Sequence, residues 1–347
     1  RVTPFSAVDF TLISSAISVS GHYLTAFNVV MIFFAIALLV VSLVVLFRKT
    51  PCIQKNKTKK AYMLSTFVVL VVITSIFVMH KSSTSVQALA ENYTNISEAY
   101  ENYGFVYCFA NSIIDTGIKK PEDYSEESVS KLKATISDKQ QDTKVKPDII
   151  MIQLESFFDI CDVKKISFSR DPLPNFHRLQ KEYTNGQLTV PTVGAGTVNT
   201  EFEVLTGMSQ HDFGVSEYPY KTVLKSKTSE SICNDLAEIG YTSHAVHNNT
   251  ATFYGRNKVF SNLGFDSFTS VEYMNNITLN PNGWVKDDVM VDEILRTLNT
   301  NREKPCFTFG ITVQSHGKYN DVDPDAKDPI EVYNSPEGKE DSYRYYV

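Results

Sequence analysis

The sequence is poor in cysteine and has no excess of basic residues. Its cysteines are scattered without a CxxC pair, which indicates neither a zinc knuckle nor a disulfide framework. The five are Cys52, Cys108, Cys161, Cys233 and Cys306. Lys and Arg number 33 against 39 Asp and Glu, and no basic face stands out, which argues against nucleic acid as a partner. A hydrophobic content of 43% and a charged content of 21% exclude a disordered chain, and 347 residues suggest about two domains.

Two long uncharged runs predict membrane-spanning helices. Residues 23–47 form 25 residues without a charge, about 37 Å of helix against a hydrocarbon core of ~30 Å. Residues 61–79 add 19 more uncharged residues. A buried core helix is the alternative for each run, but two in tandem favour two transmembrane spans. The first run is too long for a signal peptide. A signal peptide also begins with a basic segment, and Arg1 is the only Lys or Arg before this run.

The loop between the two runs sets the predicted orientation. Residues 48–60 contain six basic residues and no acidic one, which places this loop in the cytoplasm and the chain after the second run outside it. We expect a membrane region at 1–83, an extracellular helical connector at 84–146 and an extracellular main domain at 147–347. Residues 1–22 are expected to form a loop or an interfacial segment. The aromatic residues of the connector suit either the lipid interface or helices packed under the main domain.

In the main domain, short apolar runs alternate with helical patterns. Residues 148–154 have the pattern of a buried strand, residues 241–246 are expected to form a second strand, and residues 306–313 a further apolar strand. The segments with helical periodicity are 174–183, 230–239 and 285–298. Ser229 is a candidate N-cap for the second helix, and Gly240 follows its end. Strands that alternate with helices predict an α/β fold with a mostly parallel sheet flanked by helices.

Polar residues follow each of the three predicted strands. Glu155 follows the first strand, His247 the second, and Gln-Ser-His ending in His316 the third. Because the carboxyl ends of parallel strands meet at one edge of a sheet, these side chains are expected to form a ligand site there. Each residue alone is more often an ordinary loop residue, and it is their convergence that favours a site.

A glycine-rich turn lies between the first two predicted strands. Residues 194–197, Gly-Ala-Gly-Thr, precede a helix expected at 199–205 and closed by Gly207. The amino end of a helix stabilises anionic groups, and a neighbouring metal would make the Thr197 hydroxyl a nucleophile. The alternative is that Thr197 or Thr200 only caps the helix.

Four motifs occur in order along the main domain. They are IIMIQLESF (149–157), GAGTVNTEF (194–202), VHNNTATFYGR (246–256) and ITVQSHGKY (311–319). In order and spacing they resemble the lipoteichoic acid synthase family, the phosphoglycerol transferases of the alkaline phosphatase and sulfatase superfamily. The resemblance implies a sulfatase-like α/β catalytic domain outside a bacterial cell membrane, anchored by a multi-pass membrane region.

The resemblance also implies roles for single residues. Glu155 and Thr197 would contact a divalent metal, usually Mn²⁺ with Mg²⁺ as the alternative, and Thr197 would be the catalytic nucleophile. The residues expected to hold the phosphoglycerol head group are His247, Asn249, Tyr254, Arg256 and His316. Tyr254 stands where the family often has tryptophan, and the planar fork of Arg256 suits a phosphate.

The implied reaction moves glycerophosphate from phosphatidylglycerol, through a covalent threonine intermediate, to a hydroxyl of a glycerophosphate polymer or glycolipid. A phosphoethanolamine transferase shares the threonine nucleophile and is one alternative. A sulfatase-type hydrolase is another, although the sequence lacks the C/S-x-P-x-R motif of sulfatases. The alternative from another class is a non-catalytic membrane-anchored protein that binds lipid or polymer.

Two family features are missing from the sequence. The family completes its metal site with an adjacent Asp-His pair, but none follows His316, and His211-Asp212 has the reverse order. The family also has five spans, whereas two are predicted here. The sequence is therefore expected to be an internal piece that lacks both ends and carries two of the four expected metal ligands.

Overall fold

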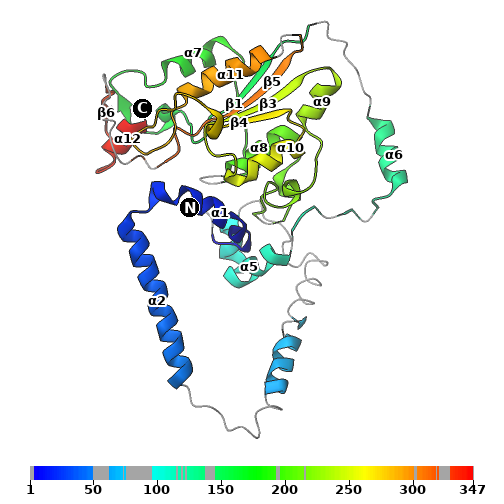
Figure 1. Cartoon of the computed structure of the whole chain (residues 1–347), viewed down its shortest axis with the longest axis vertical. Helices are drawn as coiled ribbons and strands as arrows, with labels where there is room; N and C mark the ends of the chain where they lie inside the picture. Colours follow the sequence, from blue (N-terminus) through cyan, green and yellow to red (C-terminus); the bar gives the residue numbers. More distant parts are fainter. Residues whose placement is uncertain are drawn as a thin grey trace. The chain divides into compact units, whose positions relative to one another are not determined.

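The computed structural model describes residues 4–49, 62–72, 74–75, 96–114, 116–118, 120–121, 123–136, 145–192, 196–214, 216–300, 303–317, 319 and 329–346. The chain divides into two compact units (Figure 1). The larger unit comprises Arg1–Ser18 and Ile96–Val347, and the smaller comprises Val19–Asn95. The larger unit carries the sheet, and the smaller carries the first helix predicted to span the membrane.

A parallel sheet forms the centre of the larger unit. Its strands are β1 (Ile149–Gln153), β3 (Thr242–His247), β4 (Ser267–Ser270) and β5 (Cys306–Ile311), in the order β1-β5-β3-β4. The three predicted strands are confirmed as strands, but the expected burial of the first is wrong, since Ile150 and Ile152 of β1, which lies at an edge of this sheet, are each 48% exposed. Every residue of β5 is buried, which explains its continuous apolar run. The strand β4 was not predicted, because its sequence SFTS is short and mostly polar. A separate antiparallel pair joins β2 (Ser167–Phe168) to β6 (Val332–Tyr333).

Helices cover both faces of the parallel sheet (Figure 1). On one face lie α8 (Thr197–Thr206), α9 (Ile232–Glu238) and α10 (Arg256–Asn262), and on the other lies α11 (Asp288–Thr300). Apolar side chains of α8 and α10 pack with Phe307 and Phe309 of β5, and burying each phenyl ring contributes about 1.5–3 kcal/mol. On the opposite face, Val246 of β3 packs with Met290 and Ile294 of α11. The predicted α/β fold with a mostly parallel sheet between helices is confirmed.

The other helices of the main domain are short. They are η2 (Ile160–Asp162), α7 (Pro174–Glu182), η3 (Gln210–Asp212), η4 (Val223–Lys225), η5 (Phe253–Gly255), η6 (Val271–Tyr273) and α12 (Glu340–Tyr346). Two predicted helix starts need correction. The N-cap of α9 is Ser231 and not Ser229, since Ser231 Oγ accepts a hydrogen bond from Cys233 N at 3.1 Å. The helix expected from residue 285 begins three residues later, because Val285 pairs with Leu279 in a β-bridge.

The first residues are helical, where a loop or an interfacial segment was expected. They form η1 (Ala7–Leu12) and α1 (Ile13–Tyr23), and the connector forms α4 (Ile96–Tyr103), α5 (Phe105–Ile114) and α6 (Glu126–Thr135). Ala7 N donates to Ser112 Oγ of α5 at 2.9 Å, and the Phe5 ring stacks on Phe109 at 6.1 Å. Gly117 N donates to the Glu217 carboxylate at 2.5 Å. These contacts attach the first residues and part of the connector to the larger unit.

The smaller unit contains a helix of membrane-spanning length. The helix α2 (Ala26–Lys49) has a mean hydropathy of 3.3 over its most apolar window, and none of that window is buried. In the described part of the chain it is the one helix long and apolar enough to cross a membrane. The second predicted span is helical at Tyr62–Val72, and residues 61, 73 and 76–79 lie outside the described residues. The second span therefore stays a prediction.

Candidate active site

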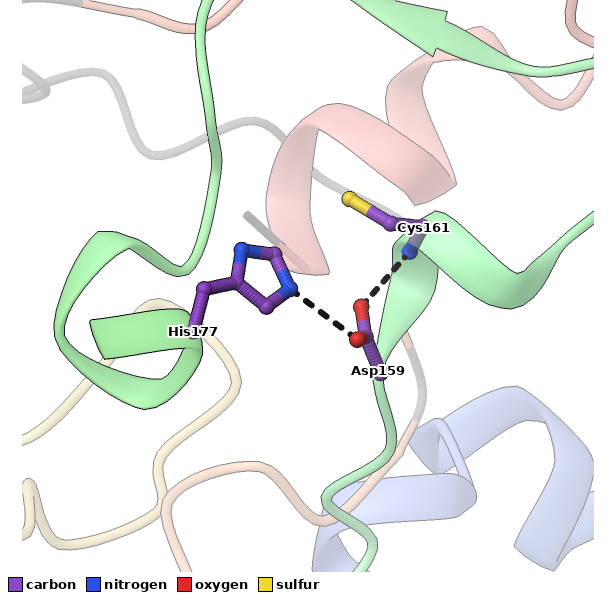
Figure 2. Close-up of side chains that lie close together, drawn as sticks. All are labelled: Asp159, Cys161 and His177. Carbon is purple, nitrogen blue, oxygen red and sulfur yellow. Dashed lines mark hydrogen bonds and ion pairs between the residues drawn. The ribbon is translucent and has the colours of Figure 1, made fainter. Parts of the chain in front are cut away.

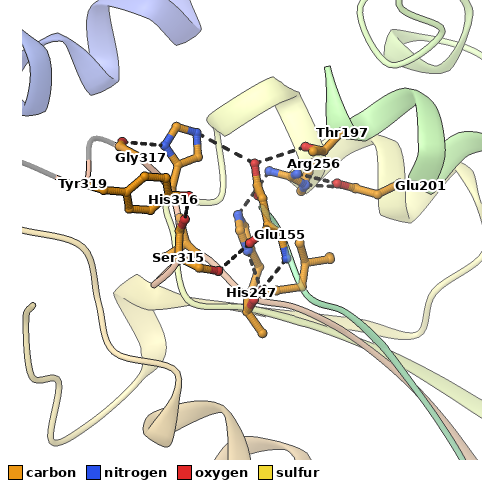
Figure 3. A network of polar contacts seen from close by, with 12 residues as sticks. Glu155, Thr197, Glu201, His247, Arg256, Ser315, His316, Gly317 and Tyr319 are labelled. Atoms are coloured by element: carbon orange, nitrogen blue, oxygen red, sulfur yellow. Dashed lines mark hydrogen bonds and ion pairs between the residues drawn. The ribbon is translucent and has the colours of Figure 1, made fainter. Parts of the chain in front are cut away.

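Glu155 lies at the carboxyl end of β1, and its side chain is buried, with the residue 5% exposed. The segment after β5 holds its backbone from two sides. Glu155 N donates to Thr312 Oγ1 at 3.2 Å, and Ser315 Oγ donates to Glu155 O at 2.6 Å. The carboxylate is thereby fixed at the edge of the sheet where the sequence predicted a ligand site (Figure 3).

Thr197 is the first residue of α8 and lies beside this carboxylate. Its Oγ1 donates a hydrogen bond to Glu155 Oε1 at 3.2 Å. The N-cap of α8 is Gly196, so the alternative that Thr197 or Thr200 caps the helix is wrong. Gly196 has a φ of 87°, and a Cβ there would lie 2.8 Å from Tyr218 Cε1. Glycine at this position thus lets the chain turn so that the hydroxyl meets the carboxylate.

Arg256 is fully buried and paired with a carboxylate that the sequence pattern did not predict. Its Nε and Nη2 donate to the two oxygens of Glu201 at 3.1 and 2.5 Å, and both side chains are 0% exposed. Burial alone would lower the pKa of Arg256, but the Glu201 carboxylate raises it above its ordinary value. The guanidinium therefore stays charged. The feature of the sequence that could have indicated Glu201 is its position one helical turn after Thr197 on α8.

His247, the last residue of β3, supports the guanidinium from the other side. Its Nδ1 lies 2.9 Å from Ile311 O, which can only accept, so Nδ1 carries the proton. Its Nε2 then accepts a hydrogen bond from Arg256 Nη1 at 3.1 Å. Burial, followed by the charge of Arg256, lowers the pKa of His247 well below its ordinary value. His247 is therefore a neutral imidazole with a defined tautomer.

His316 faces Glu155 from the segment after β5. Its Nε2 lies 3.9 Å from Glu155 Oε1, and its Nδ1 lies 3.2 Å from Gly317 O. The indole of Trp284 packs on the imidazole, with ring centroids 4.7 Å apart. Trp284 belongs to no motif, so the sequence did not predict this contact. The His316 side chain is 27% exposed, which makes it accessible to a ligand.

Glu155 and Thr197 together supply two oxygen donors at one point. Burial raises the pKa of the Glu155 carboxyl, although Arg256 and His316 oppose that rise. A buried carboxylate with a hydroxyl 3.2 Å away is a donor set that suits a hard divalent cation. These two residues are the ones that can hold a metal here.

Tyr254 lies against Arg256 in a strained backbone conformation. Its φ is 56°, a region that tyrosine rarely adopts. Its ring stacks on Tyr218 with centroids 6.3 Å apart, and the Arg256 guanidinium carbon lies 5.5 Å from the ring centroid. Burial raises the pKa of the Tyr254 hydroxyl, so the phenol stays neutral. The contacts with Tyr218 and Arg256 hold the residue in this strained conformation.

Asn249 makes contacts with its own loop and with η6. Its Oδ1 accepts from Thr250 N at 2.7 Å, and its carbonyl accepts from Val271 N at 3.1 Å. The preceding Asn248 donates to Asp287 Oδ1 at 2.8 Å. A role for Asn249 in substrate binding therefore stays a prediction.

The structure brings Glu155, Thr197 and His316 together, close enough to the Arg256 and His247 pair for the charge of Arg256 to act on Glu155.

A family model described as Sulfatase matches residues 147–346. This chain belongs to the sulfatase family. The matched part contains the whole parallel sheet and every candidate residue described above. Members of the wider sulfatase and alkaline phosphatase superfamily are enzymes, transferases or hydrolases, and generally use divalent metals.

The sulfatase-family domain is also similar to a solved phosphoglycerol transferase. That protein is Streptococcus pyogenes phosphoglycerol transferase GacH in complex with sn-glycerol-1-phosphate. It is 25% identical with a TM-score of 0.54, over 66% of this chain and 62% of that chain. The predicted resemblance to phosphoglycerol transferases of the sulfatase superfamily is confirmed.

Two curated relatives of this sulfatase-family chain come from Rhizobium meliloti (strain 1021). One, whose name provisionally assigns it to cyclic beta-1,2-glucan modification, is 30% identical over 237 residues, 68% of this chain and 36% of the relative. The other, the capsular polysaccharide biosynthesis protein RkpI, is 28% identical over 178 residues, 50% of this chain and 32% of the relative. The chain thus spans about a third of the length of these relatives.

Proposed function

We propose that this protein transfers glycerophosphate from phosphatidylglycerol to a hydroxyl of a glycerophosphate polymer or glycolipid. The observation that supports this best is the hydrogen bond from Thr197 Oγ1 to the buried Glu155 carboxylate, at the amino end of α8. The similarity to a phosphoglycerol transferase supports the donor class. The two relatives named for glucan modification and polysaccharide biosynthesis support a carbohydrate-bearing acceptor.

A divalent cation, Mn²⁺ or Mg²⁺, is proposed to bind Glu155 and Thr197. The fit rests on the chemistry of the donors, a buried carboxylate oxygen and a hydroxyl oxygen 3.2 Å apart. When bound, the cation would lower the pKa of the Thr197 hydroxyl and polarise the phosphoryl group.

Thr197 acts as the nucleophile. Its Oγ1 gives up its proton to solvent and forms a bond to phosphorus while the bond from phosphorus to the diacylglycerol oxygen breaks, which leaves glycerophosphate on the threonine. His316, whose Nε2 is 3.9 Å from Glu155 Oε1, donates a proton to the leaving oxygen. The acceptor hydroxyl then gives its proton to His316 and attacks the same phosphorus. The bond from phosphorus to Thr197 Oγ1 breaks, and Oγ1 takes a proton from solvent, which restores both residues. The amino end of α8 favours the negative phosphoryl oxygens in both steps.

The head group is proposed to bind among the residues that surround Thr197. His316 is accessible and can contact the ligand directly. Arg256 and His247 are 0% exposed, and Glu201 occupies two guanidinium nitrogens. Arg256 is therefore proposed to act on the phosphate through its charge and by holding Tyr254 in place, and His247 by holding the guanidinium.

The membrane topology is part of the proposal. We place a multi-pass membrane region at 1–83, a connector at 84–146 and the catalytic domain at 147–347, outside a bacterial cell membrane. The composition and length of α2 support the first span, and the six basic residues of loop 48–60 support its orientation. In this topology the catalytic domain lies on the side of the membrane that exposes the head groups of the outer leaflet.

Analysis of lipid products tests the proposed reaction. Full-length protein in vesicles with Mn²⁺ should release diacylglycerol from phosphatidylglycerol and transfer the labelled head group to an added glycolipid. Thr197→Ala should be inactive, and Thr197→Ser, which keeps a hydroxyl, is the matched control that should retain turnover. Diacylglycerol release from phosphatidylethanolamine instead would indicate a phosphoethanolamine transferase, and free glycerophosphate without transfer would indicate a hydrolase. Lipid binding without turnover would indicate a non-catalytic protein.

A further inference from the structure

Three metal-ligating side chains converge on the segment that follows Glu155. Asp159 precedes η2, Cys161 lies in η2, and His177 comes from α7 (Figure 2). Asp159 Oδ2 lies 3.0 Å from His177 Nε2, and the three ligand atoms lie within 4.8 Å of one another. The side chains of Asp159 and His177 are 16% and 19% exposed, and Cys161 is exposed, so the cluster is partly buried and open on one side.

A fourth residue fixes the direction of the imidazole. His177 Nδ1 lies 2.8 Å from each carboxylate oxygen of Asp171, and Asp171 Oδ1 also accepts a hydrogen bond from Leu173 N at 2.8 Å. Nδ1 therefore carries a proton, and Nε2 is aimed at Asp159 and Cys161. A carboxylate that holds the second ring nitrogen of a histidine is the arrangement found behind histidine ligands of zinc.

We propose that Asp159, Cys161 and His177 bind a Zn²⁺-type ion, with solvent in the fourth position. Nitrogen, sulfur and carboxylate oxygen are the donors that Zn²⁺ takes, at about 2.0–2.3 Å, which puts the ligand atoms of a tetrahedral site roughly 3.3–3.8 Å apart. A small approach of the exposed Cys161 sulfur closes the observed cluster to that spacing. The proposal is independent of the proposed transferase reaction.

The cluster differs in chemistry from the pair at Glu155 and Thr197. That pair offers only oxygen and suits a hard cation, whereas a thiolate and an imidazole select a softer one. The two sites are therefore expected to take different metals. Zinc at the cluster would join the segment after Glu155 to α7, two segments that already meet where the rings of Phe157 and Phe176 pack at 5.0 Å.

The metal-free cluster holds protons that a metal must displace. Hydrogen bonds to Asp171 and then Asp159 raise the pKa of His177, and a metal ion at Nε2 would replace the contact of this nitrogen with Asp159. Burial and then the neighbouring Asp159 and Asp171 charges raise the pKa of the Cys161 thiol, and Asp162 adds to this effect. Lys181 is the nearby cation that acts on Asp171. A metal ion binds the thiolate and the free Nε2 lone pair, so metal binding should weaken as the pH falls.

Cobalt titration of the full-length chain tests the site. Co²⁺ bound by a thiolate gives a sulfur-to-metal charge-transfer absorption band. Co²⁺ bound at Glu155 and Thr197, which offer only oxygen, gives no such band. After chelation, the wild-type chain should show a saturable 1:1 band, which Zn²⁺ should remove by displacing Co²⁺ from the same ligands. Cys161→Ser should abolish the band, and His177→Gln should weaken binding at least about tenfold. Asp171→Asn should weaken it by roughly 10–100-fold. Cys306→Ser and His211→Gln are the matched controls and should keep the wild-type band.

A second measurement does not depend on the folding of any variant. Zn²⁺ should protect Cys161 of the wild-type chain from alkylation, while Mn²⁺ at the same concentration should not. Absence of the band, a band that persists in Cys161→Ser, or alkylation of Cys161 at the same rate with and without Zn²⁺ would each overturn the proposal.

Discussion

Removing the charge of Glu201 tests how Arg256 is held beneath the nucleophile. In Glu201→Gln, a guanidinium that is 0% exposed loses the carboxylate that contacts two of its nitrogens. His247 cannot replace that charge, because it is a neutral imidazole. Breaking a buried ion pair from one side costs about 3–5 kcal/mol. For a domain of ~200 residues, that loss lowers Tm by roughly 6–20 °C.

A double variant separates the unpaired charge from lost packing. Glu201→Leu with Arg256→Met replaces both charged groups by apolar side chains, and its stability should lie within about 2 kcal/mol of the wild type, since such replacements are often neutral. Thermal unfolding of the full chain in detergent, followed by circular dichroism, compares the two variants. If Glu201→Gln is as stable as the wild type, the Glu201 carboxylate does not compensate the buried charge of Arg256, and the inference is refuted. A double variant as unstable as the single one would show that packing causes the loss.

Other perturbations act on the glycine turn, the buried histidine and the membrane topology. Gly196→Ala places a Cβ 2.8 Å from Tyr218 Cε1, so transfer should fall at least roughly tenfold and stability by about 1 kcal/mol or more. The matched control, Gly207→Ala, has similar backbone strain but open space around its Cβ and should keep its activity; equal loss in both would contradict the role of the contact. Because burial lowers the pKa of His247, the free energy of unfolding should be insensitive to this group above pH ~6.5 and fall below it, by at most about 1.4 kcal/mol per pH unit. His247→Asn should lose this part of the pH dependence. If urea unfolding gives the same pH dependence for His247→Asn and the wild type, the inferred pKa of His247 is refuted. In intact cells treated with a chelator, a membrane-impermeant maleimide should label the exposed Cys161 and not Cys52 of the basic loop, and the reverse labelling would invert the proposed orientation.

The sheet was largely predictable because β1 and β5 are apolar runs of strand length, and β5 is buried along its whole length. The strand β4 was not, because its place depends on a tertiary contact. Phe268 is its one large apolar residue, and it packs on Phe260 of α10 at 4.9 Å between ring centroids. The N-cap of α8 was also missed, because two threonines close to the turn offered the usual capping groups while a glycine with positive φ takes the position.

The candidate site was predictable where the strand order determines it. Glu155 and His316 follow neighbouring parallel strands, so their convergence follows from the fold class alone. Glu201 and Trp284 were not predicted, since each is defined by the side chain that it contacts and not by a motif. The cluster around Cys161 was not predicted either, because its ligands come from two segments without a regular metal-binding spacing.

The most direct test of the proposed reaction is a search for glycerophosphate bound to Thr197. Full-length protein is incubated with phosphatidylglycerol without an acceptor, quenched and digested, and the peptide that contains Thr197 is analysed by mass spectrometry. We expect a glycerophosphate adduct on this threonine that is absent in Thr197→Ala and disappears when a glycolipid acceptor is added. Turnover of phosphatidylglycerol with an unmodified Thr197, or with the adduct on another residue, would contradict the proposed mechanism.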